Sequence, residues 1–262
     1  MSFIRGRRCL FAAAVGAVLT VVGGCAPGGS DTAAASAPSS AGASSPSAAV
    51  RRPLSAAELA AALPKDGTLP GYDVNSEPET ETAGDESAES VRPAACEPLD
   101  NARSGIFTDS VASAWVHISA LKFAPPDETL TFTSYRSGGA AAHFAALAKA
   151  LDACPSLSLP NRFGGRVSVD VTRVKDNAPA GDASVSFRMH WSARTGGPKD
   201  AYKTDTEILV TTVRSGEATL TVVSDIGFAS QLSDAKKHAF IPKIDQQLLK
   251  RQADALSAAQ RS

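Results

Sequence analysis

The clearest pattern in the chain is a strict alternation of apolar and polar residues from Ala183 to Ser192. Val185, Phe187 and Met189 are separated by single polar residues, so they share one face of a β-strand. The polar residues share the other face. The pattern predicts a strand with one buried face and one face that is solvated or shared.

Other apolar segments predict strands on the same grounds: 111–123, 129–135, 167–174, 201–214 and 217–225. Ser215-Gly216 separates the last two segments and suits a two-residue hairpin turn. The second half of the chain is therefore predicted to form an antiparallel β-meander.

Helices are predicted before, between and after these strands. Ser55 and Glu58 have the spacing of a capping box, which begins a short helix that stops at Pro64. A second helix is predicted to be capped by Ser137-Gly-Gly and to run to about Ala153, with an apolar stripe that Cys154 continues. The stripe consists of Phe144, Leu147, Ala148 and Leu151.

The C-terminal segment 233–259 is predicted as a helix that starts afresh at Pro242, because proline suits the first helical turn. The residues expected to pack against the sheet are Ile244, Leu248, Leu249, Ala255 and Leu256. Segment 72–91 is rich in acids and has no base, so it is expected to be a solvated mobile loop. The predicted fold is a single α+β domain, an antiparallel sheet flanked by helices.

The N-terminus has the parts of an export signal. Arg5, Arg7 and Arg8 precede the apolar segment 9–22, which is too short to remain as a membrane-spanning helix. Residues 1–24 are therefore predicted to be a signal peptide. The pair Arg7-Arg8 leaves open whether export follows the general or the twin-arginine route.

Cys25 follows Val22-Gly23-Gly24, and this pattern resembles a bacterial lipobox. Small residues before a cysteine permit cleavage there, and the thiol then accepts a diacylglycerol. Cys25 is thus the predicted lipid anchor, on the extracytoplasmic face of the cell membrane. The alternative is an ordinary signal peptide with an incidental cysteine.

The segment that follows Cys25 cannot build a core. Residues 26–50 are almost wholly Ala, Ser, Pro and Gly, which bury too little apolar area to offset their ordering entropy. We predict a disordered linker over 25–53, of which 25 residues would span about 25–30 Å. The folded domain is expected over 54–262, a length that suits one core.

Two cysteines remain for the domain, Cys96 and Cys154, since Cys9 leaves with the signal peptide. Outside the cytoplasm such a pair is expected to form a disulfide. Two buried free thiols are the alternative.

Charge and motifs exclude several kinds of function. Without residues 1–24 the chain has 23 Lys and Arg against 27 Asp and Glu, which argues against a nucleic-acid partner. Its four histidines have no metal-binding spacing, and the sequence has no G-x-S-x-G, Walker or dinucleotide motif. No catalytic residue, metal or cofactor is predicted.

A ligand surface can be suggested only as a hypothesis. The aromatic residues that could stack on a ligand are Trp115, Trp191, Tyr135 and Tyr202, although core packing is the default for Trp191. Arg188 and His190, on the polar side of the strand 183–192, could add hydrogen bonds.

The order of these features resembles actinobacterial lipoproteins with a sensor domain like the extracellular domain of PknH. The features are the lipobox and linker, Leu69-Pro-Gly-Tyr72, Cys96 in an early loop, Ser134-Tyr-Arg-Ser137, and a helix closing on Ala153-Cys-Pro155. The resemblance covers about residues 54–260. It implies an antiparallel sheet flanked by helices and a cleft for an unidentified ligand. Many members carry two disulfides, whereas this chain has cysteines for one.

The expected function is that of a membrane-anchored lipoprotein with a non-catalytic domain that senses a ligand or docks a protein. Its partners would be the membrane, through the lipid, and a small ligand or an envelope protein. One alternative is a carrier of lipids or other hydrophobic molecules. Another is a hydrolase whose catalytic residues come together only in the fold.

Overall fold

The computed structural model describes residues 52–82, 91–107, 109–121, 127–161, 165–175, 180–195, 202–229, 232–233, 235–237, 241–243 and 245–262. The predicted signal peptide, Cys25 and nearly all of the predicted linker lie outside these residues, as do Phe123, His238 and Ile244. Residues 48–262 form one compact unit. No helix in the described part is long and apolar enough to span a bilayer.

The elements of this unit, in chain order, are α1 (Ala56–Ala62), β1 (Tyr72–Val74), β2 (Glu79–Thr82), the 3-10 helix η1 (Ala94–Cys96), α2 (Glu97–Ser104), β3 (Ser110–Ala120), β4 (Asp127–Tyr135), α3 (Gly139–Ala153), β5 (Ser156–Pro160), β6 (Arg166–Val174), β7 (Ala183–Thr195), β8 (Tyr202–Ser215), β9 (Ala218–Ala229) and α5 (Gln246–Ala259).

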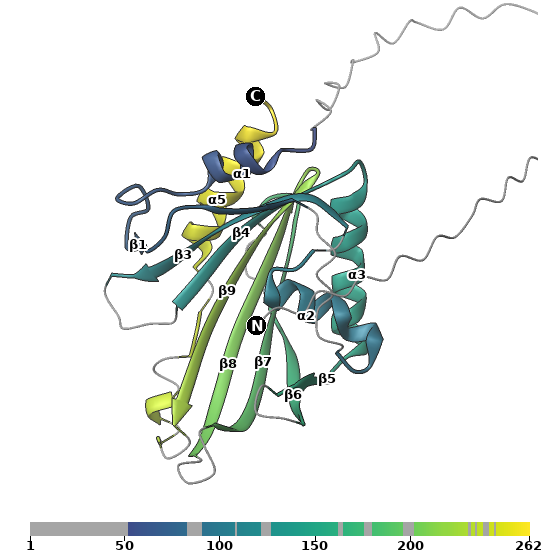
Figure 1. Ribbon diagram of the computed structural model, residues 1–262, viewed down its shortest axis with the longest axis vertical. Helices are drawn as coiled ribbons and strands as arrows, with labels where there is room; N and C mark the ends of the chain where they lie inside the picture. The colour runs from purple at the N-terminus through teal and green to yellow at the C-terminus, as the bar shows by residue number, and fades with distance from the viewer. Residues whose placement is uncertain are drawn as a thin grey trace, which may run out of the picture. The chain divides into compact units, whose positions relative to one another are not determined.

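The nine described strands form one antiparallel sheet in the order β1-β3-β4-β9-β8-β7-β6-β5, with β2 also paired to β3 (Figure 1). Each strand from β5 to β9 pairs with the next one along the chain. The other edge of β9 pairs with β4, which joins this meander to the strands of the first half of the chain. With helices on both faces of this sheet, the fold is α+β, as the sequence predicts.

The hairpin of β8 and β9 has a two-residue turn, as predicted, but the turn lies one residue later than the predicted Ser215-Gly216. Ser215 pairs with Ala218, which leaves Gly216 and Glu217 as the two turn residues. Gly216 has a φ of 60°, the left-handed conformation that such turns require. Its N–H donates to Asp182 at 2.7 Å, which ties the turn to the start of β7.

One face of the sheet is covered by α1 and α5, and we call it the terminal-helix face. Alternate residues of β3, β4 and β9, among them Val116, Phe132 and Leu220, are fully buried there against Leu59 and Leu256 of the two helices. Figure 1 shows α1 and α5 side by side over this part of the sheet. The capping box predicted for α1 is present, since Ser55 accepts from the Glu58 N–H and Glu58 accepts from the Ser55 N–H.

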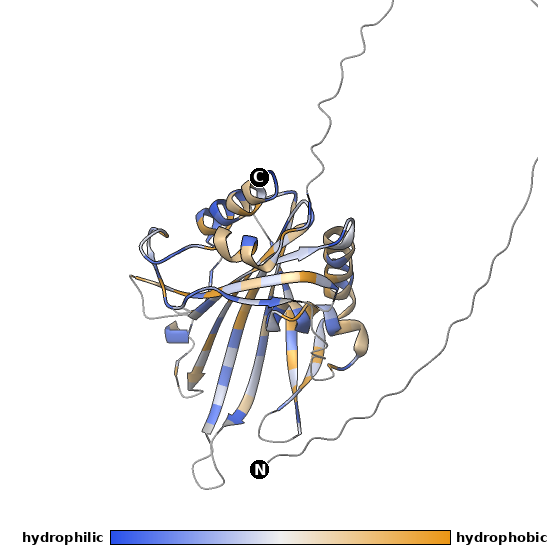
Figure 2. Ribbon diagram, turned by 45° about the horizontal axis from the view of Figure 1, so that its top comes forward, coloured by the Kyte–Doolittle hydropathy of each residue, from blue (hydrophilic) through white to orange (hydrophobic). Residues whose placement is uncertain are grey.

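The opposite face is covered by α2 and α3, and we call it the disulfide face. Here alternate residues of β6, β7 and β8 form a second core: Val169, Val171, Val185, Phe187, Met189, Ile208 and Val210. Leu99 of α2 and Leu147 of α3 are fully buried against them. Figure 2 shows the alternation of hydrophobic and hydrophilic residues along the strands that makes two faces possible.

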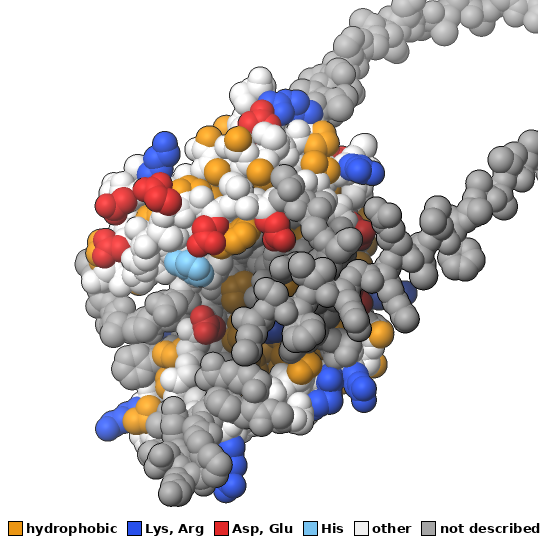
Figure 3. All heavy atoms as spheres, in the orientation of Figure 1, with side chains coloured by type: hydrophobic (Ala, Val, Ile, Leu, Met, Phe, Trp, Pro, Cys, Tyr) orange, Lys and Arg blue, Asp and Glu red, His pale blue; other side chains and the backbone are white. Residues whose placement is uncertain are grey.

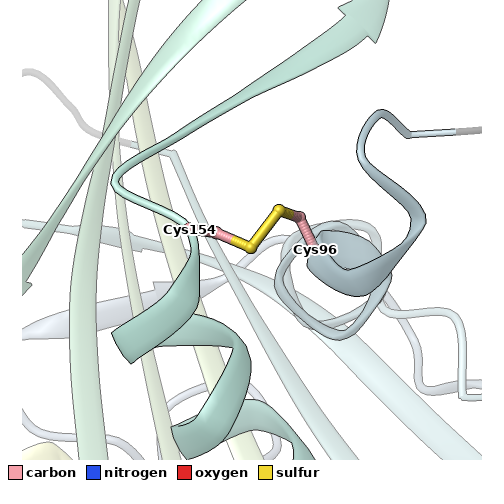
Figure 4. The surroundings of a disulfide bond; sticks show 2 residues. All are labelled: Cys96 and Cys154. Carbon is pink, nitrogen blue, oxygen red and sulfur yellow. A yellow bond between two sulfur atoms is a disulfide. The ribbon is translucent and has the colours of Figure 1, made fainter.

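A disulfide joins the two helices of this face. Cys96, the last residue of η1, is bonded to Cys154, the residue after α3, and both are buried (Figure 4). The bond fixes the start of α2 to the end of α3.

Several sequence predictions need correction. Segment 72–91 is not wholly a loop, because β1 and β2 pair with β3 through their backbones, which tolerates polar side chains. The terminal helix α5 begins at Gln246 and not at Pro242, because the Asp245 side chain caps it by accepting from two backbone N–H groups. The sequence predicts that Ala255 packs against the sheet, but in the structure Ala253 is buried and Ala255 is only partly buried.

Candidate functional site

The candidate site is built around α2, a helix with ordinary start and stop signals. Pro98 lies in its first turn, where a missing N–H costs nothing, and Glu97 favours the positive end of the helix dipole. Gly105 ends the helix with a φ of 70°, a conformation that glycine adopts without strain. Leu99 and Ala102 bury one side of α2, and pockets lie along its other sides.

The first pocket lies between the end of α2 and the sheet, and we call it the sheet pocket. It has a volume of about 380 Å³. Its lining comprises Glu81, Arg103, Ser104, Gly105, Ile106, Trp115, His117, Thr129, Thr131 and Val223. These residues come from β2, α2 and its following loop, β3, β4 and β9, so no single segment of sequence could reveal the pocket.

The polar groups of the sheet pocket are held in place by their neighbours. Arg103 donates from Nε and Nη2 to Oδ1 of Asp100, at 2.8 and 2.6 Å, and Asp100 is itself buried. His117 Nδ1 lies 3.1 Å from Thr129 Oγ1. A guanidinium and an imidazole thus lie in one pocket with the half-buried ring of Trp115. This combination can stack on a flat molecule and hydrogen-bond to its polar edge.

Figure 3 shows the molecule from the side on which α2 lies, with a hollow in the middle whose floor includes hydrophobic side chains. Acidic side chains and a histidine border the hollow in this view.

The second pocket lies between α2 and α3, and we call it the helix pocket. It has a volume of about 660 Å³. Its lining comprises Ala94, Ala95, Glu97, Pro98, Asn101, Phe107, Asp109, Gly139, Ala142, His143 and Ala146.

His143 is wedged into the floor of the helix pocket. Its ring is stacked on Tyr135 with centroids 5.3 Å apart, and it meets Phe107 edge-on at 5.2 Å. Gly139 permits this approach of α3, since a Cβ there would lie 2.9 Å from the Cβ of Tyr135. Burial lowers the pKa of His143 to about 4, although Asp109 opposes the change, so the imidazole is neutral at pH 7.

A third pocket, of about 370 Å³, lies on the terminal-helix face near Lys237 and Ile241. Its charged groups are largely paired with one another. Asp205 accepts from Lys237 and Ser192, and these hydrogen bonds lower the pKa of its carboxyl. His190 Nδ1 lies 2.9 Å from Glu207 Oε1.

Ser192 and His190 are the serine and histidine of this third pocket, but they do not form a nucleophile–base pair. The Ser192 hydroxyl donates to Asp205, whereas His190 faces Glu207. A serine nucleophile that is activated by a histidine donates its hydroxyl proton to the imidazole. Within the described residues, no group of three or more His, Cys, Asp or Glu side chains could hold a metal ion.

A buried carboxyl lies beneath the start of α5, near Asp245. Glu128 accepts from the Ser224 hydroxyl at 3.0 Å through Oε1. Burial raises the pKa of this carboxyl to about 7, and the nearby Asp245 adds to the change, while the hydrogen bond from Ser224 opposes it.

The residues suggested by the sequence as a ligand surface are not brought together. Trp115 lines the sheet pocket, whereas Trp191 packs partly buried against the core of the disulfide face. Tyr135 is fully buried. Arg188 and His190 belong to the terminal-helix face, as the alternation along β7 requires. The side chain of Tyr202 lies outside the described residues.

Sequence reasoning missed α2 and with it Arg103 and Asn101. The available signal was weak: Glu97 and Pro98 at a helix start and Cys96, Leu99 and Ala102 at intervals of three residues. A helix of eight residues gives little periodicity to detect.

Comparison with known proteins finds no matching family model and no matching curated protein. The chain resembles the extracellular domain of PknH. That domain, from Mycobacterium tuberculosis, aligns with a TM-score of 0.49 and 13% sequence identity over 81% of this chain and 100% of its own. The Rv0999 ortholog from Mycobacterium smegmatis aligns with a TM-score of 0.34 and 16% identity, over 78% of this chain and 92% of its own.

The resemblance described under Sequence analysis is to proteins with a domain like this PknH domain. Neither name states a ligand, so the function is argued from the residues of the pockets.

Proposed function

We propose that the protein is a lipoprotein, anchored through Cys25 on the extracytoplasmic face of the cell membrane, whose domain binds a small ligand in the sheet pocket and catalyses no reaction. The half-buried ring of Trp115 beside Arg103 and His117 is the observation that carries the proposal. An aromatic face with a few fixed polar groups is typical of sites that recognise small polar molecules.

The lining of the sheet pocket favours recognition over transport of lipids. A lipid carrier needs a long cavity lined by apolar side chains, whereas Glu81, Arg103 and His117 place charged and polar groups in this pocket. Arg103 is fixed by Asp100 and so is available as a ready-oriented hydrogen-bond donor.

The two tryptophans of the chain provide a matched test. In Trp191→Phe, Trp115 is the sole tryptophan, and in Trp115→Phe only Trp191 remains. We expect small molecules extracted from the producing cells' envelope to change the fluorescence of Trp191→Phe and to leave that of Trp115→Phe unchanged. A response in Trp115→Phe alone, or in neither variant, would contradict the proposed site.

Mass spectrometry of the protein isolated from its membrane tests the anchor and the carrier alternative together. The proposal requires a mature N-terminus at Cys25 that carries a diacylglycerol. A different, unmodified N-terminus would refute the anchor. Co-purification of a noncovalently bound lipid in the native protein would favour the carrier.

A further inference from the structure

The helix pocket is open because its walls are made of small side chains. Ala94 and Ala95 come from η1, while Ala142 and Ala146 come from α3. Short side chains on two neighbouring helices leave a space that larger ones would fill, and the disulfide between Cys96 and Cys154 links the two walls.

The floor of the helix pocket contains polar atoms without partners. Asn101 is 9% exposed, and its Oδ1 accepts no hydrogen bond from any described residue. Nε2 of His143, also in the floor, has no partner within the described part either. A buried acceptor without a donor is unfavourable, so a molecule that brings a donor into the pocket gains free energy that a bare apolar molecule does not.

The charges around the pocket select the kind of donor. Glu97 and Asp109 are exposed acids of its lining, and that lining includes no Lys or Arg. The imidazole of His143 is neutral at pH 7 and adds no positive charge to the floor. The polar residues of the lining are thus an asparagine with an unpartnered amide oxygen, two acids and a histidine with a neutral ring.

We infer that the helix pocket is a second binding site, separate from the sheet pocket, for a small molecule that carries a protonated amine. The ammonium group donates to Oδ1 of Asn101 and lies in the negative field of Glu97 and Asp109. The remainder of the molecule packs against the alanines of the two helices. The same chemistry is offered by a free alkyl amine and by the side chain of a lysine in a peptide.

Calorimetric titration of the purified protein with three probes tests this site. Cadaverine represents a free amine, Nα-acetyl-lysine methylamide represents a lysine side chain, and 1-pentanol is the uncharged control. We expect one or both amines to bind and 1-pentanol not to bind. The stronger of the two amines then identifies the source of the ammonium group.

Variants assign the binding to the helix pocket. Each of Glu97→Gln and Asp109→Asn should weaken amine binding about threefold, the effect typical of one exposed charge, and the double variant about tenfold. Asp73→Asn, which removes an exposed acid of β1, is the matched control and should leave the affinity unchanged. Asn101→Asp should tighten binding several-fold, and a gain of affinity cannot result from misfolding.

The proposal fails if no amine binds up to about 10 mM, the upper range of weak specific affinities. It also fails if Trp115→Phe abolishes amine binding while the double variant does not, because the amine would then lie in the sheet pocket. Since the sheet pocket is tested by the tryptophan fluorescence, either site can be refuted without the other.

Discussion

The two faces of the sheet are covered by two pairs of helices that are held in different ways. On the terminal-helix face, α1 and α5 come from the two ends of the domain and rest on a continuous core of Leu, Val, Ile and Phe. On the disulfide face, α2 and α3 are joined by a covalent bond, and most of the core beneath them belongs to the strands from β5 to β8. The remainder of that face, over β4 and β9, is lined by buried threonines such as Thr133, Thr219 and Thr221.

The comparison shows how one sheet can serve two purposes. An apolar core stabilises the terminal-helix face, and the pocket of about 370 Å³ on this face is lined by charged groups that are largely paired with one another. On the disulfide face, pockets lie along the edges of α2, and the bond between Cys96 and Cys154 holds the start of this helix to the end of α3. The following predictions test this division, from the largest expected effect to the smallest.

Removing the disulfide should affect the two faces unequally. Replacing both Cys96 and Cys154 by Ala releases a link across a sequence separation of 58, which costs up to about 4 kcal/mol of the free energy of unfolding in the chain-entropy model. Urea unfolding measures the total. Hydrogen exchange should show lost protection in α2 and retained protection in α5.

Cys25→Ser is the control, since it replaces a cysteine that lies outside the described residues and should leave the free energy of unfolding of the domain unchanged. Equal loss of protection in α2 and α5 would show that the disulfide stabilises the whole domain and not one face.

The buried carboxyl of Glu128 should make the terminal-helix face less stable as pH rises. Its pKa is about 7 in the folded protein and 4.5 in the reference state, so the folded protein holds more protons between these values. The free energy of unfolding should therefore fall by up to about 3 kcal/mol from pH 4.5 to pH 7. Glu128→Gln, which keeps an acceptor for Ser224, should abolish this fall and be more stable than wild type at pH 8.

His143 should give the disulfide face the opposite dependence. Its pKa is about 4 in the folded protein and 6.5 in the reference state, so unfolding takes up protons between these values. Stability should rise with pH over that window, by at most about 3 kcal/mol. His143→Phe, which preserves the ring contacts with Tyr135 and Phe107, should remove the rise.

Urea unfolding of the two variants at several pH values separates the faces. If Glu128→Gln also changes the rise of stability with pH that is attributed to His143, the two groups are coupled through the sheet. Unchanged pH dependence in both variants would show that neither buried group governs stability.

The long strands could be predicted from the sequence because each follows a single physical rule. Alternation along β7 predicted its buried Phe187 and Met189, and Gly216 predicted the turn between β8 and β9. The three-residue β1 and the five-residue β5 were missed, because too few residues alternate and the pairing rests on backbone hydrogen bonds.

The pockets could not be predicted for a different reason. Asn101, Asp109 and His143 lie in separate segments, and only the packing of α2 beside α3 makes them neighbours. An unpartnered amide oxygen has no sequence pattern, since its significance depends on what surrounds it. Trp115 was recognised as a candidate, but its pocket partner Arg103 belongs to a helix that the sequence did not reveal.

The attachment of Leu54 has a mechanical consequence. Its backbone N–H donates to Ser134 Oγ of β4 at 2.7 Å, and its side chain is buried just before α1. Tension applied to the chain ahead of residue 52 would therefore load α1 and the central strands of the terminal-helix face first. The sheet pocket takes Trp115 from β3 and Thr129 from β4, so a pull on the chain would reach this pocket through the same strands.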